Sequence, residues 1–223
     1  MNILILGEKE RSDELLKLLN NNCSEHKCTV NNESEFDNFD IVFDLNFDTD
    51  QKHLEVYIGL KNKIIFLSSV QLQLADAFAS TKQTTTNTFI GINALPTFID
   101  RSRLELSLLA ESQNKALTKI MQTLHTDYTL VSDRVAMVTP RVICMIINEA
   151  CYTLQEGTAN IKDIDLGMKL GTNYPHGPFE WCDKIGIKNV YETLLAVYED
   201  TKDERYKICP LLKTKYLKQE SFY

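Results

Sequence analysis

The sequence of 223 residues has no long hydrophobic run, no cluster of basic residues and no closely spaced cysteine pair. No apolar stretch reaches the roughly 18 residues that a membrane-spanning helix needs. The apolar start at residues 2–6 is predicted to be a strand and not a signal peptide. The formal net charge of −7, with Lys and Arg dispersed, disfavours nucleic-acid and anionic-membrane partners. Low-complexity segments and internal repeats are also lacking.

Six cysteines, at positions 23, 28, 144, 151, 182 and 209, form no C-x-x-C pair. Together with four scattered histidines they give no metal-site spacing, so no metal is predicted. Cys144 and Cys151 lie seven residues apart on one helix face and are expected to pack in a core. A reducing, cytoplasmic setting is therefore the expectation.

The first half of the chain alternates short apolar runs with turns. Residues 2–6 form a buried strand that ends at Gly7, and a helix continues from Ser12. Further strands are predicted at residues 28–30, 39–45, 63–67, 88–93 and 103–106. This pattern predicts a reduced Rossmann-like parallel sheet over residues 1–130.

A dinucleotide-binding start needs three glycines, for the turn, for the approach of the pyrophosphate and for helix packing. Gly7, Lys9 and Ser12 occupy these three places, so only the first glycine is present. Lys9 or Arg11 could reach a phosphate at the helix N-terminus, but the added side chains would crowd it. A structural Rossmann-like start is favoured over a working NAD site, and both interpretations stay open.

The segment 140–187 carries helix start and stop signals. Thr139 can cap a helix that begins at Pro140, and Gly157 lies just past its end. The apolar face of this helix suits a domain core and a dimer seam. Its members are Val142, Ile143, Ile146, Ile147, Ala150 and Leu154.

Two more helices are predicted to follow. Asn160 with Asp163 three residues later opens the first in the manner of a capping box, and Gly171 closes it. The turn at residues 174–180 delivers the chain into the next helix at Pro178. In all, four or five helices are expected over residues 131–223, giving an α/β fold followed by an all-α fold.

This helical segment resembles the C-terminal domain of the 3-hydroxyacyl-CoA dehydrogenases. The motifs that carry the resemblance are Asn148-Glu149-Ala150, Asp163-Ile164-Asp165, Met168-Lys169-Leu170-Gly171, and Tyr174-Pro175 with Gly177-Pro178-Phe179-Glu180. The resemblance implies a helical domain of the 6-phosphogluconate dehydrogenase-like type behind an NAD-binding domain. It also implies acyl-CoA as a ligand and a homodimer formed through the helical domain. Residues 221–223 resemble the end of the family's domain.

The family's catalytic residues can be carried over one at a time. Its serine, which holds the substrate oxygen, corresponds to Ser68, and its glutamate, which orients the catalytic base, corresponds to Glu105. The base itself is a histidine in the family, and Asn93 stands in its place. The family's substrate-holding asparagine precedes an arginine, and here Pro140 precedes Arg141.

These substitutions have chemical consequences. A carboxamide does not titrate near neutral pH, so Asn93 cannot accept the hydroxyl proton, although it can donate a hydrogen bond to Glu105. Pro140 offers no polar side chain. The family's ribose-binding acidic residue falls near Asn32, with Glu33 close by, and a simple turn is an equally good interpretation there.

The family's long helical excursion between the second and third strands, which carries a lysine near CoA, is reduced here to a few residues.

Simpler interpretations apply to several of these positions. Ser68 and Ser69 are common turn residues, and Glu105 could face water. His125 and His176 are interpreted as surface histidines. The aromatic residues Tyr174, Phe179 and Trp181 are expected to pack between helices, and residues 200–207 are expected to form a solvated loop.

Two functions of different class follow from these observations. The first is a catalytically impaired or non-catalytic member of the family, acting as a binding or assembly partner of fatty-acid β-oxidation enzymes. The second is an active NAD-dependent dehydrogenase that oxidises a 3-hydroxyacyl-CoA to the 3-ketoacyl-CoA with an altered base. Asn93 and the Gly7, Lys9 and Ser12 triplet discriminate between them.

Overall fold

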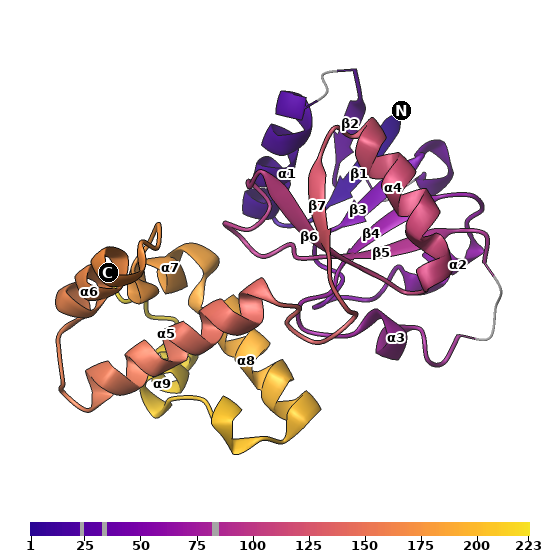
Figure 1. Ribbon diagram of the computed structural model, residues 1–223. Helices are drawn as coiled ribbons and strands as arrows, with labels where there is room; N and C mark the ends of the chain where they lie inside the picture. Colours follow the sequence, from indigo (N-terminus) through magenta and orange to yellow (C-terminus); the bar gives the residue numbers. More distant parts are fainter. Residues whose placement is uncertain (23–24, 33–34, 82–84) are drawn as a thin grey trace. The chain divides into compact units, whose positions relative to one another are not determined.

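The computed structural model describes residues 1–22, 25–32, 35–81 and 85–223 of the chain (Figure 1). They divide into two compact units, residues 1–137 and 138–223. The boundary predicted from the sequence, near residue 130, is a few residues earlier than the observed one. In the described chain no helix has the length and apolarity to cross a bilayer.

The N-terminal unit is built on a seven-stranded sheet in the order β2-β1-β3-β4-β5-β6-β7. The pairs from β2 to β5 are parallel, β5 and β6 are antiparallel, and β6 and β7 are parallel. The strands are β1 (Asn2–Leu6), β2 (Lys27–Val30), β3 (Ile41–Asp44), β4 (Ile64–Ser68), β5 (Thr88–Ile92), β6 (Arg103–Leu108) and β7 (Asp127–Leu130). The predicted α/β class with a largely parallel sheet is confirmed.

Helices cover both faces of this sheet, because side chains along each strand alternate between the faces. Ile3 and Ile5 pack in a core with α1 and α4, whereas Leu4 and Leu6 pack in a second core with α2 and α3. The helices are α1 (Lys9–Asn22), α2 (Leu54–Gly59), α3 (Leu74–Ala77) and α4 (Asn114–Thr123), with 3-10 turns at Phe36–Asn38 and Glu111–Gln113.

The strand order reverses at β1, which lies between β2 and β3. In doubly wound sheets the crevice at such a reversal, outside the carboxyl ends of the strands, is where ligands bind. The connection between β2 and β3 contains the 3-10 turn Phe36–Asn38, and its residues 33 and 34 lie outside the described ones.

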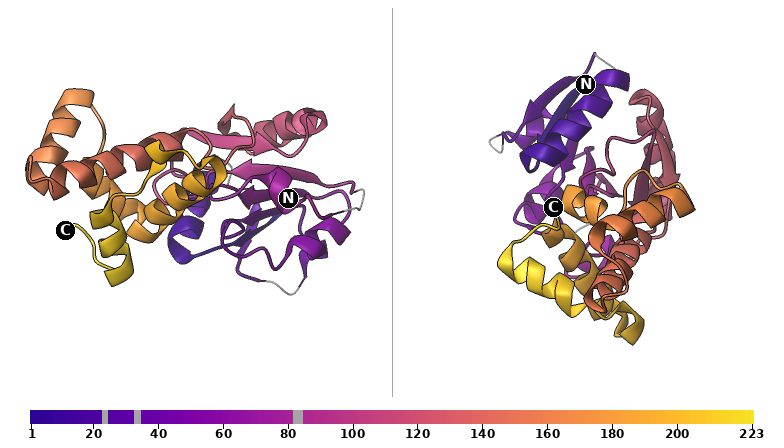
Figure 2. Two further views of the ribbon diagram at one scale, coloured as in Figure 1. Left: turned by 90° about the horizontal axis from the view of Figure 1, so that it is seen from below. Right: turned by 90° about the vertical axis from the view of Figure 1, so that its left-hand side faces the viewer.

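In the C-terminal unit α5 is central and contacts the four other helices (Figures 1 and 2). The buried side chains on its inner faces include Ile143, Cys144, Ile147 and Cys151, which confirms the predicted packing of the two cysteines. The helices are α5 (Thr139–Gln155), α6 (Ile161–Thr172), α7 (Pro178–Ile185), α8 (Ile187–Thr201) and α9 (Pro210–Lys218), with a 3-10 turn at Glu204–Tyr206.

Two predicted helix ends are wrong. The first helical hydrogen bond of α5 is accepted by the carbonyl of Val138, so Thr139 is already inside the helix and does not cap it. Gly171 lies within α6, and the left-handed residue after the helix is Asn173, with φ of 57°. Asparagine adopts this conformation more readily than most residues, and it therefore replaces glycine as a stop signal.

Other predicted helix start and stop residues are confirmed. Asn160 caps α6, because its Oδ1 accepts the N–H of Asp163 at 3.0 Å. Gly157 follows α5 with φ of +72°, and Pro178 is the first residue of α7.

The predicted apolar face of α5 is divided between core and surface. Ile143, Ile147 and Ala150 are buried in the core, whereas Val142 is 50% exposed and Ile146 and Leu154 are partly buried. The dimer seam predicted for this face stays a prediction.

The charged run at residues 200–207 is largely exposed, as predicted, but it is only partly a loop. Residues 200 and 201 end α8, residues 204–206 form a 3-10 turn, and Tyr206 is buried and accepts a hydrogen bond from Arg141 at 2.9 Å.

A buried carboxylate joins distant parts of this unit. Asp165 on α6 accepts the N–H groups of Phe179 and Glu180, at 2.8 and 3.0 Å, and the hydroxyl of Tyr223 at 2.9 Å. Burial is the largest cause that raises the pKa of Tyr223 to about 12, and the hydrogen bond to Asp165 adds to it. Gly177 permits this contact, since a Cβ there would lie 2.3 Å from Cβ and Cγ of Asp165.

Gly177→Ala should therefore lower the free energy of unfolding of this unit by about 1–3 kcal/mol, because the added methyl group forces Asp165 to move. Gly171→Ala is the matched control, since a Cβ there meets nothing within 4 Å, and it should stabilise α6 by up to about 1 kcal/mol. Urea unfolding followed by the fluorescence of Trp181 measures both. Equal effects of the two changes would contradict the role assigned to Gly177.

Candidate functional site

A pocket of about 290 Å³ lies at the strand reversal of the N-terminal unit. Of the predicted cofactor-binding residues, Gly7 lines it, whereas Lys9 and Asn32 do not; Glu33 is outside the described residues. The pocket is lined by Leu6, Gly7, Glu8, Asn31, Asp44, Asn46, Asp50, Lys52 and His53. It is formed by the loops that follow β1, β2 and β3.

The backbone donors of the loop after β1 are bound by side chains of the protein. The N–H of Gly7 donates to Oδ1 of Asn31 at 3.0 Å, and Nδ2 of Asn31 donates back to the carbonyl of Gly7 at 3.1 Å. The N–H of Glu8 donates to Oδ1 of Asn46 at 3.4 Å. Donors in this position cradle the pyrophosphate in a working dinucleotide site. Two carboxamides engage them here.

The other two fingerprint positions also depart from a working site. Lys9 is the first residue of α1 and is exposed. Ser12 is buried, and a Cβ added to Gly7 would lie 3.3 Å from its hydroxyl oxygen and 2.9 Å from Cβ of Leu45. The close packing of helix and strand thus remains, with serine in the place of the third glycine.

The pocket is rich in carboxylates. Asp44 is buried, and its carboxylate accepts the hydroxyl of Tyr57 at 2.8 Å and the N–H of Asn46 at 3.2 Å. Nδ1 of His53 lies 3.7 Å from the same carboxylate. Burial raises the pKa of Asp44, while these donors and His53 oppose the rise. Glu8 and Asp50 add two more carboxylates, against the single lysine Lys52.

Ser68, at the end of β4, is fully buried and donates its hydroxyl hydrogen to Oδ2 of Asp48 at 2.8 Å. The other carboxylate oxygen of Asp48 lies 3.7 Å from Nη1 of Arg11, whose side chain is 3% exposed. Nη1 of Arg11 also donates to the carbonyl of Leu45 at 2.6 Å. Burial raises the pKa of Asp48, and the charge of Arg11 and the bond from Ser68 oppose that rise. The predicted substrate serine is thus engaged inside the protein.

Asn93 and Glu105 are brought together as predicted. Nδ2 of Asn93 donates to Oε2 of Glu105 at 3.3 Å, and the side chains are buried, with 2% and 9% exposed. The interpretation in which Glu105 faces water is wrong, because only 9% of this residue is exposed. Arg101 lies near this pair, and the carboxylates of Glu105 and Glu14 oppose the lowering of its pKa by burial.

Pro140, the remaining predicted site residue, is buried in the first turn of α5 and belongs to the C-terminal unit. Its side chain offers no polar atom.

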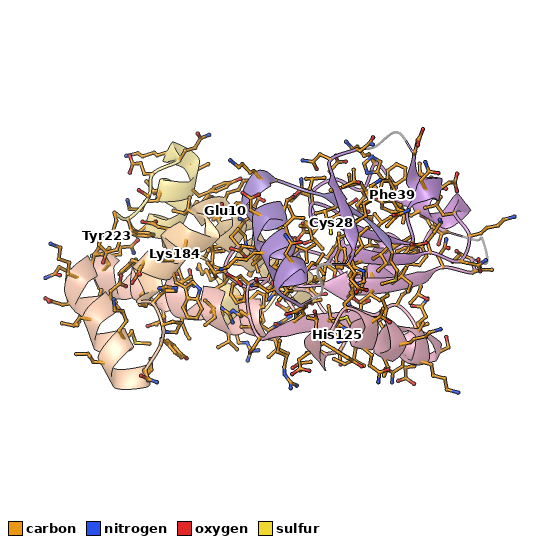
Figure 3. The ribbon with its side chains drawn as sticks, turned by 90° about the horizontal axis from the view of Figure 1, so that it is seen from above. Glu10, Cys28, Phe39, His125, Lys184 and Tyr223 are labelled. Carbon is orange, nitrogen blue, oxygen red and sulfur yellow. The ribbon has the colours of Figure 1, made fainter. Side chains whose placement is uncertain are left out.

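The sequence-based predictions missed Asp48 and His53, and they treated Arg11 as a residue that could reach a phosphate, whereas its side chain is buried. A helical signal for Arg11 was present, since positions 11, 15 and 18 follow the i, i+4, i+7 spacing of one buried face. His125 is exposed at the end of α4 (Figure 3), and His176 contacts Glu180 at 3.1 Å. Within the described ranges, no group of three or more His, Cys, Asp or Glu side chains is placed to hold a metal ion.

The C-terminal unit matches a known protein family. The family "3-hydroxyacyl-CoA dehydrogenase, C-terminal domain" matches residues 137–221. A 3-hydroxybutyryl-CoA dehydrogenase of Bradyrhizobium diazoefficiens is 42% identical over 77 residues, which cover 34% of this chain and 26% of that protein. A probable 3-hydroxybutyryl-CoA dehydrogenase of Bacillus subtilis is 34% identical over 119 residues, covering 53% and 37%. The chain thus matches well under half of the length of these curated relatives.

Solved structures share the whole fold at low identity. The (S)-3-hydroxybutyryl-CoA dehydrogenase of Ralstonia eutropha superimposes with a TM-score of 0.77 at 18% identity, covering 100% of this chain and 98% of that one. FadB2 of M. tuberculosis gives a TM-score of 0.78 at 14% identity, covering 99% and 97%. The predicted architecture, a Rossmann-like domain followed by a helical domain, is confirmed.

The ion pair of Arg11 and Asp48 gives a test of the buried site. Arg11→Met leaves the Asp48 carboxylate buried without its cation and should cost about 3–5 kcal/mol in the free energy of unfolding at pH 7. Burial already raises the pKa of Asp48 in the folded protein, and loss of Arg11 raises it further. The deficit should therefore shrink as the pH falls through that raised pKa and Asp48 takes up a proton.

Two further variants complete this test. Arg11→Met combined with Asp48→Asn removes both charges and should cost less than the sum of the two single changes. Lys17→Met removes an exposed cation from the same helix and should cost below about 1 kcal/mol. A deficit for Arg11→Met that stays constant between neutral and acidic pH would contradict the assignment.

Proposed function

We propose that this chain, whose residues 137–221 belong to the C-terminal domain family of the 3-hydroxyacyl-CoA dehydrogenases, is a non-catalytic member of that family. The observation that carries the proposal is the buried pair of Asn93 and Glu105. It retains the contact between orienting carboxylate and base, but the base is replaced by a carboxamide. The oxidoreductase activity of the relatives is therefore not carried over to this chain.

Proton abstraction is the first step that this substitution removes. Oxidation of a 3-hydroxyl group to a ketone requires a group that accepts the hydroxyl proton, and a carboxamide accepts none near neutral pH. A positioned general base is worth about 10²–10⁴ in rate. His53 cannot replace Asn93 directly, because it lines the pocket after β1 and β3 while Asn93 follows β5.

Cofactor binding is the second function that we propose is lost. The N–H groups of Gly7 and Glu8 are engaged by Asn31 and Asn46, so a pyrophosphate would have to displace two internal hydrogen bonds. The three carboxylates of the pocket would also repel its charge. NAD, which the family implies, does not fit these residues, and no reaction step is assigned to it here.

The enzymes with which the family works suggest a function for this chain that does not require catalysis. A Rossmann-like scaffold joined to a helical domain offers binding surfaces without chemistry, and we propose a role as a binding or assembly partner of fatty-acid β-oxidation enzymes. Binding of acyl-CoA and a homodimer through the helical domain stay predictions. Exposed apolar side chains in the helical unit, such as Val142, Leu166 and Leu170, support the dimer. Free thiols at Cys144 and Cys182 support a reducing cytoplasm.

The proposal predicts no saturable binding of NADH at millimolar concentration by calorimetry, and no NADH-dependent reduction of acetoacetyl-CoA above the blank. An active dehydrogenase of the family serves as the positive control. Asn93→His restores the base but not the cofactor loop, so this variant should stay inactive as well. Micromolar NADH binding with turnover by the unmodified protein would instead establish the active NAD-dependent dehydrogenase.

A further inference from the structure

The pocket at the strand reversal is a formed cavity, and the proposed function leaves it without a ligand. We propose that it binds a small molecule that is rich in O–H or N–H donors and carries no phosphate. This inference rests on the proposed loss of NAD binding and names the ligand class of the same site.

The lining offers more acceptors than donors. The carboxylates of Glu8, Asp44 and Asp50 face the pocket, whereas its ionisable donors are Lys52 and His53. Nζ of Lys52 lies 3.7 Å from Oδ2 of Asp50, so this cation already has a carboxylate beside it. Hydroxyl and amino groups of a ligand would find acceptors here, and an amine would also gain from the excess negative charge.

The deepest carboxylate is held rigidly. The side chain of Asp44 is 4% exposed, and it is fixed by Tyr57 from one side and by the N–H of Asn46 from the other. His53, with its side chain 13% exposed, stands beside it. A buried charged group with fixed neighbours is pre-organised, which reduces the entropy cost of binding a ligand.

The same lining is unfavourable for an anion such as phosphate. The N–H groups of Gly7 and Glu8, which would receive a phosphate, donate to Asn31 and Asn46 instead. Without these donors a phosphate would face mainly carboxylates, and like charges at close range are strongly unfavourable. The pocket therefore selects against phosphate, and not only against the complete dinucleotide.

The volume of about 290 Å³ limits the size of the ligand. Pockets for drug-sized ligands begin at about 300 Å³, so this one has room for a molecule of nucleoside or polyamine size. A dinucleotide is about twice as large. Neutral hydroxyl donors and cationic amines are two sources of the same hydrogen-bonding chemistry, and the experiment separates them.

Calorimetric titrations with adenosine, spermidine, AMP and NAD⁺ form a matched set. We expect saturable binding of adenosine or spermidine, with AMP bound about tenfold or more weakly than adenosine or not at all. Binding of adenosine alone identifies a neutral hydroxyl-rich ligand, and binding of spermidine alone identifies a cationic one. AMP binding as tightly as adenosine, or no binding by either phosphate-free probe at millimolar concentration, would overturn the inference.

Two paired variants test whether the ligand binds in this pocket. Glu8→Gln removes a carboxylate that lines the pocket and should weaken the phosphate-free ligand about fivefold or more. Glu10→Gln, two residues away on the exposed side of α1 (Figure 3), makes the same change in net charge outside the pocket and should leave the affinity unchanged. Equal losses in both variants would show that the ligand binds elsewhere.

The titrations also separate this inference from the proposed function. Tight NAD⁺ binding would defeat both. Failure of every probe would defeat the pocket assignment alone and leave the non-catalytic proposal standing.

Discussion

The buried carboxylate of Asp48 is the contact on which the polar crevice of the N-terminal unit depends. It lies in the loop after β3 and joins Arg11 of α1 to Ser68 at the end of β4. A buried charge is tolerated only when it is paired and hydrogen-bonded, so these three positions constrain one another. These contacts join the loop after β3 to α1 and to the carboxyl end of β4.

The same arrangement is compatible with the proposed loss of catalysis, because the fold keeps its internal contacts at these positions. Glu105 has a hydrogen-bond partner in Asn93, and the hydroxyl of Ser68 has one in Oδ2 of Asp48, so both contacts are made within the protein. The other oxygen of Asp48, Oδ1, makes no hydrogen bond among the described residues and lies 3.7 Å from Nη1 of Arg11. Asn93, in the place of the family's histidine, keeps a hydrogen-bond donor beside Glu105, so the buried carboxylate has a partner whether or not the protein is catalytic.

Sequence patterns predicted β1 to β6, α1 and the helices of the C-terminal unit because these depend on local periodicity, whereas the helices α2, α3 and α4 were not predicted. The apolar runs of the sheet and the cap at Asn160 are readable from neighbouring residues alone. Gly171 and Thr139 misled because several residues near a helix end can serve as its signal, and the choice is made by packing. The pairing of Asn93 with Glu105 was predicted from the family resemblance, which supplies the positions of base and glutamate. Asp48 meets Arg11 across 37 positions of the chain, a contact that no local pattern encodes.

The two asparagines that engage the loop after β1 have a consequence for the protein in the cell. A nucleotide-binding domain normally gains stability from its ligand by mass action, and its population of folded molecules follows the ligand concentration. Here Asn31 and Asn46 accept the N–H groups of Gly7 and Glu8 from within the protein. Under the proposed loss of dinucleotide binding, the folded population of this protein would be independent of the cellular pool of dinucleotide.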